Sequence, residues 1–193
     1  MSTINIDVQY FYSGDGTAAG SLGGAISVNQ PVSATDGNLF ANISAADALA
    51  GGIDHYRCLY LKNTSTNRLF SNIGIYFETV TPSDGTEVYI ANAISPVNGV
   101  EPTSANEITE PAGVGVWQQP IADYDTIPIV NLGIGDTIGL WVKRSIFANT
   151  DGLVKDDFRL LLIGDSTVGS GNAVTKEDDG LLFQEDGFII LQE

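Results

Sequence analysis

The chain has 193 residues, 43% of them hydrophobic, and its 24 Asp and Glu outnumber 8 Lys and Arg to give a formal net charge of -16. The length suits one domain with an arm or tail, and the composition excludes a chain that is disordered throughout. The charge argues against binding to nucleic acid or to an anionic membrane surface, because that affinity comes largely from Lys and Arg. No apolar run approaches the roughly 20 residues of a membrane span.

The N-terminal residues predict a strand followed by a long irregular segment. Residues 1 to 7 lack the basic start and apolar core of a signal peptide, so we expect the chain to fold in a cytoplasm. Apolar side chains alternate with others from Ile4 to Tyr12, which is the period of a strand with one buried face. Residues 13 to 38 are rich in Gly, Ser, Asp and Asn and are too long for a hairpin turn. They form either an ordered arm or a surface loop.

One short helix and seven strands are expected in the middle of the chain. Ser44 can cap a helix that runs to Ala50, with Asp47 in its first turn and Gly51 ending it. Strands are expected at residues 54–62, 69–80, 86–93, 113–118, 127–131, 137–146 and 157–163. This pattern predicts an all-β, immunoglobulin-like β-sandwich, with a jelly roll as the alternative.

Two of these strands show how their faces are used. In residues 69 to 80, Leu69, Ile73, Ile75 and Phe77 share one parity, which predicts a sheet that is wet on its other face. In residues 56 to 62 both parities are partly apolar, which indicates a central strand. Between later strands, residues 95 to 125 contain four prolines and form an insertion that we expect to cover a sheet edge.

The C-terminus carries a tandem repeat. Asp179 to Glu185 and Asp186 to Glu193 each consist of Asp-Gly, an apolar run and Gln-Glu. Each Asp-Gly predicts a tight turn and each apolar run a short strand, so the tail is interpreted as a hairpin or two successive rungs. Its apolar runs must be buried against this domain or a neighbouring subunit.

The chain offers little that predicts catalysis or cofactor binding. His55 and Cys58 are its only His and Cys, and on one strand an offset of three puts them on opposite faces. We therefore interpret His55 as a surface residue, and too few ligands remain for a His/Cys zinc site. The stretches beginning at Gly14, Gly113 and Gly133 lack the phosphate-binding spacing and predict turns and bulges instead. No catalytic, cofactor-binding or metal-binding residue is assigned, and no cofactor is expected.

Acidic and aromatic residues leave two alternatives open. An acidic pair could serve a hydrolase, and Asp156-Asp157 or Glu177-Asp178-Asp179 could bind calcium, although solvated charge explains these clusters more simply. Trp117 and Tyr124 in the insertion could stack on a sugar, or they could anchor a subunit interface. Trp141 lies in a strongly periodic strand and is expected in the core.

Three segments within residues 39 to 166 are distinctive: "YRCLYLKNTSTNRLFSNIGIYFETVTPSDGTEVYIANA", "LGIGDTIGLWVKRSI" and "DDFRLLLIGDS". Together they resemble a group of tailed-bacteriophage structural proteins with an immunoglobulin-like domain. The Asp-Gly tail is also similar to short repeats at the ends of phage proteins. The resemblance implies no catalytic residues.

The resemblance and the acidic charge together suggest a division of the chain and a role. Residues 1–38 would be an N-terminal strand and arm, 39–166 the sandwich with its insertion at 95–125, and 167–193 the repeat tail. The expected role is that of a non-enzymatic virion protein that decorates and stabilises the capsid exterior. Its partners would be the major capsid protein and copies of itself, with trimers as the natural oligomer. The alternative is a tail, baseplate or fibre module that binds host-surface glycan.

Overall fold

The computed structural model describes residues 2–3, 7–32, 39–41, 45–50, 52–80, 85–148 and 158–168. These residues form nine strands and one helix of six residues. In chain order the elements are β1 Ser2–Thr3, β2 Val8–Ser13, β3 Ile26–Pro31, α1 Ala45–Ala50, β4 Ile53–Asn63, β5 Arg68–Val80, β6 Thr86–Asn92, β7 Ile127–Pro128, β8 Thr137–Ile146 and β9 Phe158–Val168.

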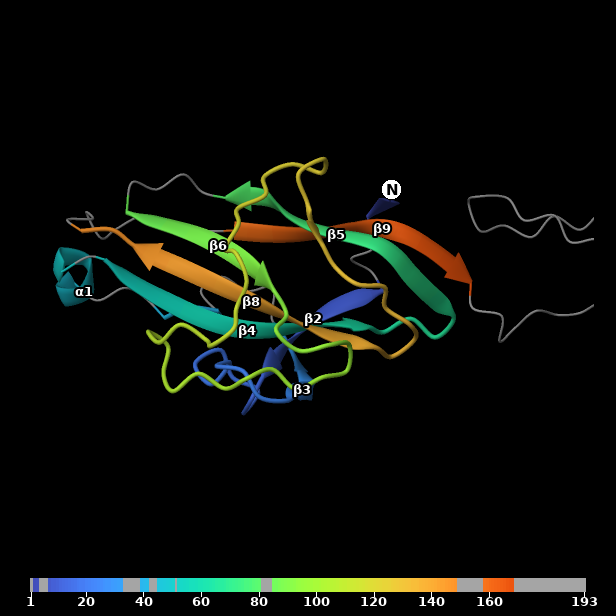
Figure 1. Ribbon diagram of the computed structural model, residues 1–193, viewed down its shortest axis with the longest axis horizontal. Helices are drawn as coiled ribbons and strands as arrows, with labels where there is room; N and C mark the ends of the chain where they lie inside the picture. Colours follow the sequence, from blue (N-terminus) through green and yellow to red (C-terminus); the bar gives the residue numbers. More distant parts are fainter. Residues whose placement is uncertain are drawn as a thin grey trace, which may run out of the picture.

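The strands form two antiparallel sheets that pack as a sandwich, as Figure 1 shows. The four-stranded sheet has the order β1-β9-β5-β7, and the five-stranded sheet has the order β3-β2-β4-β8-β6. The prediction of an all-β sandwich is therefore confirmed. No helix in the described part of the chain is long and apolar enough to cross a membrane.

Strand β4 lies at the centre of the five-stranded sheet, between β2 and β8. The central position was predicted from the apolar residues on both of its faces. Side chains of odd number, such as Leu59 and Leu61, point toward the other sheet, whereas Cys58 and Tyr60 point away from it. All four are at most 3% exposed, so both faces of this strand are buried.

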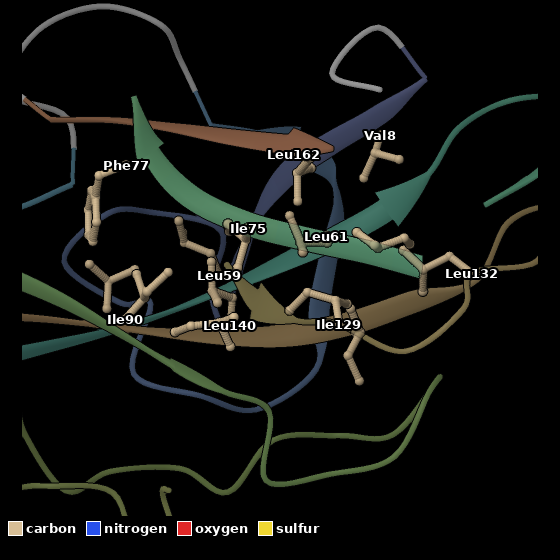
Figure 2. Packing of buried hydrophobic residues seen from close by; sticks show 14 of the residues in the cluster. Val8, Leu59, Leu61, Ile75, Phe77, Ile90, Ile129, Leu132, Leu140 and Leu162 are labelled. Atoms are coloured by element: carbon tan, nitrogen blue, oxygen red, sulfur yellow. The ribbon is translucent and has the colours of Figure 1, made fainter. Parts of the chain in front are cut away.

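The main core lies between the two sheets. Leu59, Leu61 and Leu140 of the five-stranded sheet meet Ile75 and Leu162 of the four-stranded sheet (Figure 2). Each of these side chains is at most 3% exposed. Burying one such side chain is worth roughly 1.5–3 kcal/mol. The apolar alternation of the strands is therefore what holds the sandwich together.

A bulge in β5 changes the predicted face of one residue. The pairing of β5 with β9 shifts register between Ser71 and Gly74, and Asn72 has a left-handed φ of 50°. The extra residue reverses the parity of the strand before it, so Phe70 is 2% exposed while Leu69 is 41% exposed. The prediction that Leu69 shares the buried face was wrong for this reason, although it was right for the later apolar residues of the strand.

Three other differences from the predicted elements concern irregular parts of the chain. Strand β3 lies within the segment that was expected to lack strands. The strand expected at residues 113–118 is only one bridge, Gln118 to Ile90, and the strand expected at 127–131 is the two-residue β7. Gly113 and Gly115 interrupt the first of these two segments, and Pro128 interrupts the second. Predictions for Ser44, for the Asp156-Asp157 and Glu177-Asp178-Asp179 clusters and for the repeat tail lie outside the described residues.

Candidate functional site

The face of the five-stranded sheet that points away from the core is covered by loops. Residues 14–25 and 94–118, here called the outer loop layer, lie over β4 and β8 at the bottom of the view in Figure 1. Beneath them is a second apolar cluster, whose fully buried members are Cys58, Tyr60, Ala91 and Trp141. The prediction that Trp141 belongs to the core is confirmed, but its core is this second cluster. The protein thus has three layers, of which the third has almost no regular structure.

Glu101 fixes the outer loop layer to the sheet, although it is a carboxylate and only 2% exposed. Its oxygens accept hydrogen bonds from the amides of Ile94 at 3.1 Å and Ser95 at 2.9 Å. They accept a third from Nε1–H of Trp141 at 2.8 Å. The amide of Glu101 also donates to the hydroxyl of Tyr60 at 2.8 Å. A buried carboxylate is tolerable only when donors surround it in this way.

Two glycines allow this close packing. A Cβ at Gly139 would lie 2.5 Å from Cγ of Glu101, so only glycine leaves room for the acidic side chain on β8. A Cβ at Gly23 would lie 1.9 Å from the carbonyl oxygen of Pro102, and Gly23 also has a φ of 95°. The backbone of the two halves of the layer can therefore approach closely.

Backbone hydrogen bonds join the loops to the open edge of β4. Beyond the end of its pairing with β2, the amide of Cys58 donates to the carbonyl of Ser21 and the amide of Tyr56 donates to that of Glu107, both at 2.7 Å. The segment at residues 13 to 32 is consequently held by its own chain. These bonds satisfy the backbone amides of Cys58 and Tyr56, which no neighbouring strand pairs with on this side of β4.

The Pro-rich insertion also covers sheet edges, as its composition predicted. Ile90 of the edge strand β6 exchanges two backbone hydrogen bonds with Gln118, at 2.8 and 2.9 Å. Two residues later the carbonyl of Pro120 accepts from the amide of Phe77 in β5 at 2.8 Å. The insertion therefore passes from the edge of one sheet to the edge of the other.

His55 is buried and not on the surface, so its predicted location was wrong. It is 8% exposed, because β4 already pairs with β8 at Ile53 and His55 lies opposite Arg144. Its Nδ1 lies 2.8 Å from Nη2 of Arg144. Since a guanidinium only donates, the imidazole accepts there. Cys58 lies on the opposite face in the second cluster, so the prediction that the two cannot pair locally is confirmed.

Two arginines hold the segment before α1. The guanidinium carbons of Arg57 and Arg144 lie 5.5 and 4.8 Å from the ring centroid of Phe40. Arg57 is 2% exposed and pairs with the carboxylate of Glu107. The hydrogen bond from Arg57 and its charge hold the pKa of Glu107 below its usual value. This cluster is an internal clamp between the sandwich and the insertion.

The thiol of Cys58 is poorly suited to nucleophilic chemistry. It is fully buried, and burial together with the nearby charge of Glu101 raises its pKa far above the usual range. A nucleophilic cysteine needs the opposite shift. Among the described residues there is also no group of three or more His, Cys, Asp or Glu that could hold a metal ion.

Trp117 and Tyr124, the two candidates for sugar stacking, differ in their surroundings. The ring of Trp117 lies 5.6 Å from that of Tyr56, and Nζ of Lys143 lies 5.5 Å above it. Its Nε1–H donates to Glu110 at 2.7 Å. Tyr124 is 90% exposed. Trp117 is therefore partly buried and packs against its own chain, whereas Tyr124 is exposed.

Exposed apolar side chains are concentrated on the insertion. Twelve large apolar side chains of the described residues are exposed, and five of them belong to residues 95–125. The five are Val100, Ile108, Val116, Ile121 and Tyr124. Sequence reasoning identified the insertion but missed Glu101 and Arg57 as the residues that fix it. Nothing in the sequence around Glu101 indicates that it is buried. Arg57, in contrast, lies at an odd-numbered position of β4, and this position could have predicted its burial.

Comparisons with known proteins add no relative. No family model, curated protein or solved structure matches the chain.

Proposed function

We propose that this protein is a non-enzymatic structural protein of a tailed bacteriophage that decorates and stabilises the capsid exterior. The observation that carries the proposal is the insertion at residues 95–125, which is hydrogen-bonded to both sheets and holds five of the twelve large apolar side chains that are exposed among the described residues. A rigid scaffold that presents apolar side chains on anchored loops is suited to contact with another protein. The resemblance of the strand segments to phage structural proteins supports the same role.

The net charge of -16 supports an external position. A surface of this charge is repelled by the phosphates of packaged DNA, whereas an outer position exposes it to solvent and to basic patches of a lattice. The partners in this proposal are the major capsid protein and further copies of this chain, with trimers at symmetry axes. The immunoglobulin-like assignment of the sandwich, with the jelly roll as its alternative, belongs to the same proposal.

The experiment is to locate the protein in particles of the parent phage. Antibody-labelled electron microscopy of purified particles should place it on the outside of the head, and particles made without it should lose DNA at lower temperature. Particles that lack the protein, or heads whose thermal stability does not change without it, would refute the proposal.

A glycan-binding module of the tail or baseplate is the second candidate. The exposed Tyr124 is the observation that favours it, because an open aromatic ring can stack on a sugar. Trp117 is occupied by Tyr56 and Lys143, so the two do not share one platform. Labelling at the tail, with binding to host polysaccharide that Tyr124→Ala abolishes, would support this candidate over decoration.

A further inference from the structure

The turn at residues 121–125 presents the most exposed large apolar side chain of the described residues. Tyr124 is 90% exposed and Ile121 is 68% exposed. The amide of Asp125 donates to the carbonyl of Ala122 at 3.0 Å and closes the turn, which is the yellow loop near the top of the view in Figure 1. Asp123 and Asp125 flank the tyrosine and are exposed. A phenol ring therefore projects between two carboxylates.

Both ends of this turn are attached to β5. At one end Pro120 is buried, and its carbonyl accepts the amide of Phe77 at 2.8 Å. At the other end Ile127 is fully buried and pairs with β5. Between them Thr126 packs so closely on Gly74 that a Cβ there would lie 2.5 Å from Oγ1 of the threonine. The turn is thus held before any partner arrives, which reduces the entropy lost on binding.

We propose that Tyr124 is the anchor of the contact with the partner and inserts into an apolar pocket rimmed by Lys or Arg on the capsid lattice. The inference rests on the proposed function and names the residue that performs it. Exposed tyrosines that become buried are common centres of binding energy, since one rigid ring supplies a large apolar area and a hydroxyl. The pocket rim is basic because Asp123 and Asp125 accompany the ring and the chain as a whole is acidic.

The experiment measures binding of the full-length protein to isolated heads that lack it. Tyr124→Ala should weaken binding by roughly 30-fold or more, the loss typical of a residue at the centre of an interface. Tyr124→Phe keeps the ring and should bind within a few-fold of the wild type. Leu49→Gln is the matched control, because Leu49 is 73% exposed on α1, outside the insertion, and this variant should bind within a few-fold of the wild type.

A second variant tests the rim. Asp123→Asn with Asp125→Asn should slow association and make binding less sensitive to salt, because charges at the edge of a contact act mainly on encounter. Thermal unfolding of all variants should match the wild type, since the substituted side chains are exposed.

The outcomes separate the two proposals. Wild-type protein that does not bind the heads would overturn both the decoration role and the anchor. Wild-type binding with an equal affinity for Tyr124→Ala would overturn the anchor alone. Binding that the Asp substitutions and added salt leave unchanged would overturn the basic rim.

Discussion

The two faces of the five-stranded sheet are both buried, but they are covered in different ways. Toward the second sheet, Leu140 of β8 packs among apolar side chains and is 0% exposed. On the other face its neighbours Gly139 and Trp141 lie beneath loops that are fixed by the carboxylate of Glu101. The cover of one face is therefore stabilised by the burial of apolar side chains. The cover of the other face depends on a few polar groups, each of which satisfies several buried hydrogen-bond donors. The second kind of cover is more sensitive to a single polar substitution.

Removal of Glu101 should have the largest effect. Glu101→Ala leaves the indole N–H of Trp141 and the amides of Ile94 and Ser95 without their acceptor. The loss of three buried hydrogen bonds to a charged group should lower the free energy of unfolding by about 3–5 kcal/mol. Urea unfolding measures this loss. Hydrogen exchange should show amides of residues 94–118 losing protection before those of β5 and β9, and uniform loss across both sheets would contradict the separate anchoring of the loops.

Truncation of Leu140 tests the opposite face. Leu140→Ala should lower the free energy of unfolding by about 3 kcal/mol, because it removes apolar contacts and leaves a cavity between the sheets. In contrast to the Glu101 variant, it should reduce hydrogen-exchange protection in both sheets together. Selective exposure of the outer loop layer in this variant would show that the two faces are not held independently.

The same contrast explains which parts could be predicted from the sequence. The bounds of β8 were predicted correctly at 137–146, since its apolar run begins after a Gly-Asp turn and needs no distant partner. The burial of Glu101 could not be predicted, because in the sequence it is a single Glu among loop residues and resembles a solvated charge. Its partner Trp141 is distant in the chain and comes close only in the folded protein. The burial of His55 depended in the same way on its position opposite Arg144. Apolar periodicity is local, whereas polar anchoring joins residues that are far apart in the chain.

Substitution of Gly139 tests the contact between β8 and Glu101. In Gly139→Ala the new Cβ would lie 2.5 Å from Cγ of Glu101, and the anchored side chain must shift. We expect a loss of about 2 kcal/mol in the free energy of unfolding, the usual scale of overpacking. The double variant that combines Gly139→Ala with Glu101→Ala should lose less free energy of unfolding than the sum of the two single losses, because the Glu101 side chain that would collide with the new Cβ is absent. Strict additivity would mean that the glycine is required for another reason.

The ion pair between Arg57 and Glu107 should give the smallest effect, and this effect should depend on pH. Glu107→Gln should lower the free energy of unfolding by about 1 kcal/mol at pH 7, a modest loss because the Glu107 side chain is 43% exposed. Folding lowers the pKa of Glu107 from its ordinary value of 4.5, so its contribution is complete above that pH and disappears as the pH falls through the folded-state pKa. The stabilities of wild type and variant should therefore converge in paired unfolding titrations as the pH falls through the lowered pKa of Glu107. A difference that persists undiminished into acid would show that packing of the Glu107 side chain, and not its charge, holds the insertion against Arg57.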